Sequence, residues 1–128
     1  MTRLTHKARI AFAGLLGLVL FAAGWAVASQ PPKKAYVLVQ VDVTNPAQYQ
    51  EYAKLSPGIV AQFGGKYLAR AGRTVTLEGP RARARVVVLE FPSFERAEAF
   101  YNSPEYVAAR KVRAGAGQAQ FVLVEGTE

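Results

Sequence analysis

The alternation of side chains from Tyr36 to Val43 constrains this chain more than any other feature. Valine occupies every odd position of the segment, which predicts a β-strand with one wholly apolar face. The even positions mix apolar and polar residues: Tyr36, Leu38, Gln40 and Asp42. Such a strand needs helices against its valine face and a second, partly polar cover over the other face.

Three more strands are predicted, at Lys66–Ala71, Arg85–Phe91 and Gln120–Glu125. By alternation, we expect the helix-covered face to include Val87, Leu89, Phe91, Val122 and Val124. The opposite face then holds Leu68, Arg70, Val86, Val88, Glu90, Phe121, Leu123 and Glu125. That face is too apolar for water, so two such sheets are expected to pack face to face in a homodimer.

Helix-start signals divide the rest of the domain. Asn45-Pro46, Ser93 and Ser103-Pro104 each place a capping side chain before an apolar helical stripe. Pro57-Gly58 predicts a kink or break before Ile59. The order strand–helix–strand–strand–helix–strand predicts an α+β, ferredoxin-like βαββαβ sandwich. It has a four-stranded antiparallel sheet with helices on one face, and two copies pair into a dimeric α+β barrel.

The first 28 residues form a basic start followed by an apolar run. Arg3, Lys7 and Arg9 precede 19 apolar residues that end in Ala26-Val27-Ala28. Small residues at this point are typical of a signal-peptidase site, and we favour cleavage after Ala28. The alternative is an uncleaved inner-membrane anchor, because the run is nearly long enough to cross a bilayer. We therefore expect residues 1–28 to be a signal peptide or anchor, 29–34 a linker and 35–126 an exported periplasmic or secreted domain.

Composition narrows the chemistry of that domain. The chain has no cysteine and a single histidine, His6, which lies in the export segment. Thiolate catalysis and zinc–thiolate sites are excluded, and we expect no cofactor and no metal. Without the three basic residues of the leader, 13 basic residues face 9 acidic ones, a net charge of +4. The one dense basic cluster is Arg81, Arg83 and Arg85, which we interpret as a solvated strand edge rather than a nucleic-acid site.

The chain resembles the domain of unknown function 1330 family from Ala35 to Gly126. The resemblance rests on Asp42, Asn45-Pro46, Tyr49, Tyr52, Phe63-Gly64-Gly65, Leu68, Arg70, Gly72, Glu78-Gly79, Glu90-Phe91-Pro92-Ser93, Tyr101, Ser103-Pro104-Glu105-Tyr106, Arg110 and Val124-Glu125-Gly126. It implies a ferredoxin-like fold and a dimeric α+β barrel. It does not imply one activity, because proteins with that barrel include monooxygenases, isomerases, decarboxylases and ligand binders.

Glu90 and Arg70 are the candidate catalytic residues, because both are predicted to face the barrel interior with Gln40. Arg70 would hold an anionic or carbonyl oxygen while Glu90 removes a proton. The competing interpretation is a structural ion pair, which we favour. Tyr101 and Tyr106 are candidate ligand-binding residues, since tyrosine lines small pockets; the alternative is packing at a helix–sheet boundary.

Three functions stay open. The first is a dimer that binds a small polar or aromatic molecule or is purely structural. The second is a cofactor-independent enzyme of monooxygenase, isomerase or decarboxylase type that uses Glu90 and Arg70. The third is a membrane-tethered interaction module, with residues 10–28 as the only membrane contact. We expect no nucleic-acid partner.

Overall fold

The structure is a computed structural model that describes residues 30–128. The elements, in chain order, are β1 (Ala35–Val43), α2 (Pro46–Gln62), β2 (Lys66–Arg70), β3 (Arg85–Phe91), α3 (Phe94–Asn102), α4 (Pro104–Val112) and β4 (Gly117–Glu125). The predicted export segment and its cleavage site lie outside the described residues. Within residues 30–128, no helix is long and apolar enough to cross a membrane.

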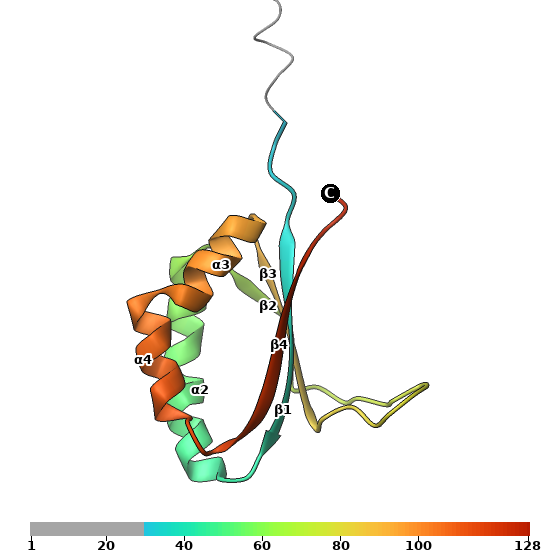
Figure 1. Cartoon of the computed structure of the whole chain (residues 1–128), viewed down its shortest axis with the longest axis vertical. Coiled ribbons are helices and arrows are strands. Elements are labelled where there is room, and N and C mark those ends of the chain that lie inside the picture. Colours follow the sequence, from blue (N-terminus) through green and yellow to red (C-terminus); the bar gives the residue numbers. More distant parts are fainter. Residues whose placement is uncertain (1–29) are drawn as a thin grey trace, which may run out of the picture. The chain divides into compact units, whose positions relative to one another are not determined.

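The four strands form one antiparallel sheet in the order β2-β3-β1-β4. All three helices cover the same face of this sheet, and the other face has no cover within the described chain (Figure 1). We call the uncovered side the open face. The ferredoxin-like α+β fold predicted from the sequence is confirmed, with the second helical region divided into α3 and α4 at Ser103.

The predicted caps begin the helices. The side chain of Asn45 accepts a hydrogen bond from the Gln48 amide, and Ser93 accepts one from the Arg96 amide. Ser103 ends α3 and begins α4: its hydroxyl donates to the Phe100 carbonyl and accepts from the Tyr106 amide. These bonds satisfy backbone groups that helix ends leave without partners.

The core lies between the helices and the valine face of the sheet. Val37, Val39 and Val41 are each at most 5% exposed. Phe91, Phe100 and Tyr106 are almost fully buried above them, and their rings stack in sequence. Gly65 is required here, because a Cβ at this position would collide with the Phe91 ring and with Val60.

The predicted facing of β4 is wrong. Leu123 pairs with Val37 and Phe121 pairs with Val39, so both face the helices. Val122 and Val124 are instead on the open face, 45% and 44% exposed. From Phe121 to Val124, both the odd-numbered and the even-numbered residues of β4 are apolar, so alternation alone does not show which set faces the helices. The pairing register with β1 decides which side chains are covered.

The predicted facing of Arg70 is also wrong. Tyr67 pairs with Leu89, and the register then shifts by one residue before Ala69 pairs with Val88. This irregularity places Arg70 opposite Val87, on the helix-covered face rather than with Glu90. One extra residue in a strand moves every later side chain to the other face.

Helix α2 is continuous through Pro57, so of the kink or break predicted before Ile59 the break does not occur. Proline lacks an amide hydrogen, so the Ala53 carbonyl four residues earlier loses its helical donor. An Nη2–H of Arg70 donates to that carbonyl at 3.0 Å, and the Arg70 guanidinium lies over the Tyr67 ring. The strand β2 thus supplies the hydrogen bond that Pro57 removes.

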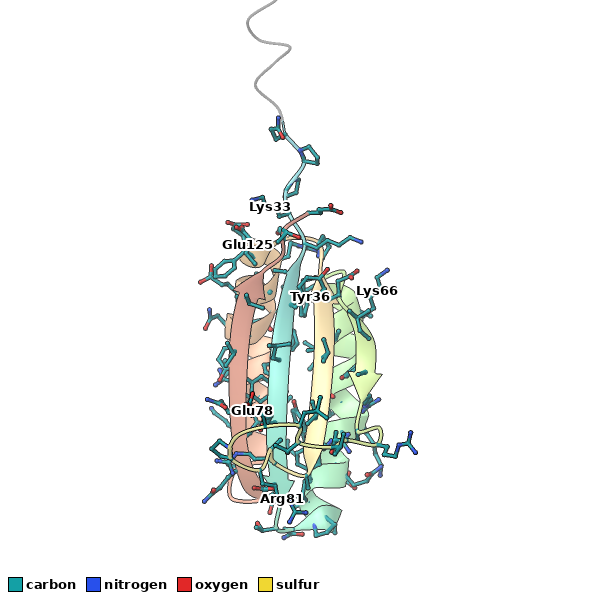
Figure 2. The ribbon with its side chains drawn as sticks, turned by 90° about the vertical axis from the view of Figure 1, so that its right-hand side faces the viewer. Lys33, Tyr36, Lys66, Glu78, Arg81 and Glu125 are labelled. Atoms are coloured by element: carbon teal, nitrogen blue, oxygen red, sulfur yellow. The ribbon has the colours of Figure 1, made fainter. Side chains whose placement is uncertain are left out.

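Residues 71–84 form a segment without regular secondary structure that joins β2 to β3. This segment, which we call the arm, projects away from the open face (Figure 1) and crosses in front of the sheet near Glu78 and Arg81 (Figure 2). Its base is fixed to β1: the Arg83 amide donates to Gln40 Oε1, and the Ala84 amide donates to Asp42. That backbone bond holds the pKa of Asp42 below its usual value.

The cluster predicted to be a solvated strand edge is divided among different environments. Arg81 is exposed, but Arg83 is half-buried and forms a salt bridge of 3.1 Å with Asp42. Arg85 lies on the helix side, with its guanidinium 5.3 Å from the centre of the Tyr49 ring.

The link between Pro57 and Arg70 can be measured with a double-mutant cycle. In the wild type, Arg70→Ala is expected to lower the free energy of unfolding by about 1 kcal/mol, because the Ala53 carbonyl loses its donor. In a Pro57→Ala background the helix supplies that donor itself, so the same change is expected to cost clearly less. Urea unfolding of the four proteins checks this, and an equal cost of Arg70→Ala in both backgrounds would contradict the account.

Candidate functional site

Glu90 faces the open side of the sheet and is held by two lysines. Its Oε1 lies 3.7 Å from Lys34 Nζ and 3.6 Å from Lys66 Nζ. Lys66 is its direct cross-strand partner, and the Glu90 side chain is only 13% exposed while both lysines are much more open. The charge of Glu90 is therefore compensated by lysine rather than by Arg70.

The other residues predicted for the barrel interior are also separated. Gln40 lies on the open face and accepts from the base of the arm. Arg70 lies on the helix-covered face, bonded to α2. One protomer therefore does not assemble Arg70 and Glu90 into a single site, because the register shift in β2 divides them between the two faces.

Tyr106 is buried in the core rather than lining an open pocket. Its side chain is 1% exposed, and its hydroxyl lies 2.5 Å from the hydroxyl of Tyr52 in α2. Burial raises the pKa of both phenols above their usual value of 10.0, most strongly for Tyr106. One hydroxyl donates to the other, and this hydrogen bond joins α2 to α4 through the core.

A small cavity lies beside this tyrosine pair, beneath α2. It measures about 30 Å³ and is bordered by Ser56, Tyr67 and Arg85 as well as by Tyr52 and Tyr106. A cavity of that size has room for one or two water molecules and not for an organic substrate.

A much larger hollow lies between α3, α4 and β4, and we call it the β4 cleft. Its volume is about 590 Å³, within the range of small-molecule sites, and it is open to solvent on one side. Its border includes Tyr101, Phe121, Arg110 and Arg113, two further polar residues, Glu98 and Asn102, and aliphatic side chains from the strands and helices. Tyr101, a ligand-binding residue predicted from the sequence, therefore lies in a cleft, although the binding role stays a prediction.

The Arg110 side chain is held against Tyr101. Its guanidinium lies 4.1 Å from the centre of the Tyr101 ring, and its terminal nitrogens donate to the Tyr101 hydroxyl at 3.2 Å and to the Tyr101 carbonyl at 3.3 Å. Three contacts to one residue fix the orientation of the guanidinium, because stacking and two hydrogen bonds each restrict a different rotation.

Arg113, one helical turn further on, lies between two aromatic rings. Its guanidinium is 5.0 Å from the centre of the Tyr52 ring and 5.1 Å from that of Phe121. The Nε atoms of Arg110 and Arg113 are both buried without a hydrogen-bond partner among the described residues. Neither arginine forms an ion pair with a carboxylate within residues 30–128.

Arg110 and Arg113 were not predicted from the sequence as site residues. The available signal was their spacing of three, which places both on one helical face, close to the aromatic residues Tyr101 and Tyr106. Phe121 was not predicted as a cleft residue, because it was expected on the open face of the sheet rather than on the helix-covered face. No group of three or more His, Asp or Glu side chains that could hold a metal occurs in residues 30–128.

The sheet order and one-sided helices define the class of the domain, a ferredoxin-like α+β sandwich. A family model described as a domain of unknown function, DUF1330, matches residues 34–127, and the chain belongs to this family. The resemblance inferred from the sequence is thereby confirmed. No sequence match was found among curated proteins.

Solved structures of low sequence identity share the fold. RPA0582 from Rhodopseudomonas palustris, a protein of unknown function, is 20% identical with a TM-score of 0.62 over 86% of this chain and 93% of that one. A dimeric protein of unknown function from Bacteroides fragilis, with a ferredoxin-like fold, is 14% identical with a TM-score of 0.51, over 76% and 100%. SnoaB from Streptomyces nogalater, a cofactor-independent oxygenase, is 11% identical with a TM-score of 0.52, over 75% and 95%. These likenesses establish the fold alone.

The buried tyrosine pair gives the protein a defined loss of stability at high pH. Because burial raises both pKa values, the phenols stay protonated in the folded state while the unfolded chain loses protons from about pH 10 upward. The free energy of unfolding is therefore expected to fall as pH rises through and above 10, and to fall less steeply in Tyr106→Phe. Urea unfolding between pH 8 and 11.5 measures both slopes, and identical slopes would contradict this assignment.

Proposed function

We propose that the protein is a homodimeric binding protein, in which two open faces pack together and each protomer binds a small polar or aromatic molecule. The observation that supports the dimer most directly is the apolar open face. Leu38, Val122 and Val124 are each 44–45% exposed there, on adjacent strands. Contiguous exposed aliphatic side chains on a folded domain are typical of an interaction surface.

The polar groups of the open face are compatible with being covered. Glu90 is paired with Lys34 and Lys66, and Gln40 and Asp42 accept from the arm. A second sheet could therefore cover this surface without leaving these groups unpaired, which avoids the larger cost of burying a charge or a hydrogen-bonding group with no partner.

The arm supports the same arrangement. It projects from the open face, on the side where a partner sheet would lie (Figure 1). Its side chains Val75 and Leu77 are 76% and 90% exposed, among the most exposed large apolar side chains of the described chain. In a dimer these two side chains would pack against the partner. The Bacteroides fragilis neighbour, which is described as dimeric, is consistent with this proposal.

The β4 cleft supports the binding part of the proposal. It lies on the helix side of each protomer, at the edge strand β4, so its walls come from one chain. The alternative of a cofactor-independent enzyme that uses Glu90 and Arg70 is not favoured, because the structure places the two residues on opposite faces of the sheet.

The dimer can be tested with two substitutions of equally exposed leucines. Leu38→Asp places a charge on the open face, and Leu55→Asp places one on α2, where Leu55 is 47% exposed. Light scattering after size exclusion, on protein purified from expression of the whole chain, is expected to show a dimer for the wild type and for Leu55→Asp. Leu38→Asp is expected to raise the dissociation constant at least tenfold. A monomeric wild type, or equal weakening by both changes, would refute the dimer.

We also propose that the domain functions outside the cytoplasm. The basis is the sequence of residues 1–28, where the basic start, the apolar run and Ala26-Val27-Ala28 occur in the order of an export signal.

Intact-mass measurement of the protein from its native type of host tests the location. The expected mass is that of a chain beginning at Ser29, after cleavage behind Ala28. A full-length chain recovered from the inner membrane would instead indicate the anchor, and a full-length chain in the cytoplasm would contradict export.

A further inference from the structure

The walls of the β4 cleft differ in character from one side to the other. Val37, Ala97 and Leu123 give it an apolar floor, and Phe121 adds an aromatic ring. The ring centres of Phe121 and Tyr101 lie 5.8 Å apart and tilted, so aromatic surface is present on both β4 and α3. An apolar body of the size of one or two rings would bury its surface against these groups.

The charged side of the cleft is cationic. Arg110 and Arg113 border it, and Glu98 is the one acidic residue among its lining residues. Formal charges of two arginines and one glutamate leave a surplus of one positive charge. A ligand with a single negative charge would neutralise the cleft, whereas a phosphate dianion would leave it negative.

The guanidinium groups are oriented before any ligand arrives. Tyr101 holds Arg110 by stacking and by two hydrogen bonds, and the Tyr52 and Phe121 rings flank Arg113. Aromatic rings orient a cation but do not neutralise it. The two hydrogen bonds to Tyr101 use one N–H of each terminal nitrogen of Arg110, so the second N–H of each has no partner among the described residues. A planar carboxylate is the anion whose geometry matches the fork of a guanidinium.

We propose that the β4 cleft binds a small aromatic monocarboxylate, with the carboxylate at Arg110 and Arg113 and the ring against Phe121 and Tyr101. This inference rests on the proposed function insofar as it specifies the molecule that the dimer binds. It does not require the dimer, because the lining residues come from the helix-covered side of one protomer.

The test compares 2-naphthoate with the uncharged 2-naphthamide by isothermal titration calorimetry, on protein purified from expression of the whole chain. The naphthoate is expected to bind at least tenfold more tightly than the amide. Arg110→Gln is expected to weaken naphthoate binding at least tenfold, and Arg110→Lys less, because lysine keeps the charge but loses the fork. The matched control is Arg96→Gln, since Arg96 also lies over an aromatic ring, that of Phe63, but is exposed and outside the cleft.

Methyl NMR of the wild type decides the location even if Arg110→Gln fails to fold. Naphthoate is expected to shift the methyl signals of Ala97 and Leu123, in the cleft, and to leave those of Leu38 and Val124, on the open face, unchanged. Absence of binding at millimolar naphthoate, equal affinity for the amide, equal effects of Arg110→Gln and Arg96→Gln, or shifts on the open face would each overturn the proposal.

Light scattering on the same samples separates this proposal from the dimer. A monomer that binds naphthoate in the cleft would refute the dimer and retain the ligand. A dimer that binds the amide as well as the carboxylate would retain the dimer and refute the ligand class.

Discussion

The one-sided cover of the sheet is the constraint on which the rest of the structure depends. Three helices bury the valine face of β1 and the matching residues of β3 beneath a cluster of aromatic rings, and they cover nothing on the other side. The open face nevertheless has aliphatic side chains on adjacent strands, with its charges already paired. The proposed dimer follows from that unequal cover, and the arm, bonded at its base to Gln40 and Asp42, extends from the same uncovered side.

Within residues 30–128, several arginines are oriented by aromatic rings rather than by carboxylates. A guanidinium lies over a tyrosine ring at four positions, pairing Arg70 with Tyr67, Arg85 with Tyr49, Arg110 with Tyr101 and Arg113 with Tyr52. Arg70 also replaces the helical donor that Pro57 lacks. The arginines of the β4 cleft differ from Arg70 because they border a space large enough for a ligand, and there the same stacking leaves a cation oriented toward an anion.

The sequence was sufficient for the architecture and insufficient for the site, for physical reasons. Caps at Asn45, Ser93 and Ser103 are local signals, and β1 has valine at every odd position, so the helix starts and the helix-covered face of β1 could be predicted. The face on which each β4 side chain lies could not be predicted, because the odd-numbered and the even-numbered residues of this strand are both apolar from Phe121 to Val124. The facing of Arg70 could not, because an irregularity in strand pairing leaves no trace in the composition of β2. Sites depend on such long-range register, and the candidate pair of Arg70 and Glu90 failed to assemble for that reason.

The central claim is that a second copy of this chain covers the open face, and isotope-filtered nuclear Overhauser spectroscopy tests it most directly. In a mixture of ¹³C-labelled and unlabelled protein, the account expects intermolecular contacts from the methyl groups of Leu38, Val122 and Val124 to open-face or arm residues of the other copy. Intermolecular contacts confined to helix residues, or no intermolecular contacts at a concentration where the protein is fully folded, would contradict it.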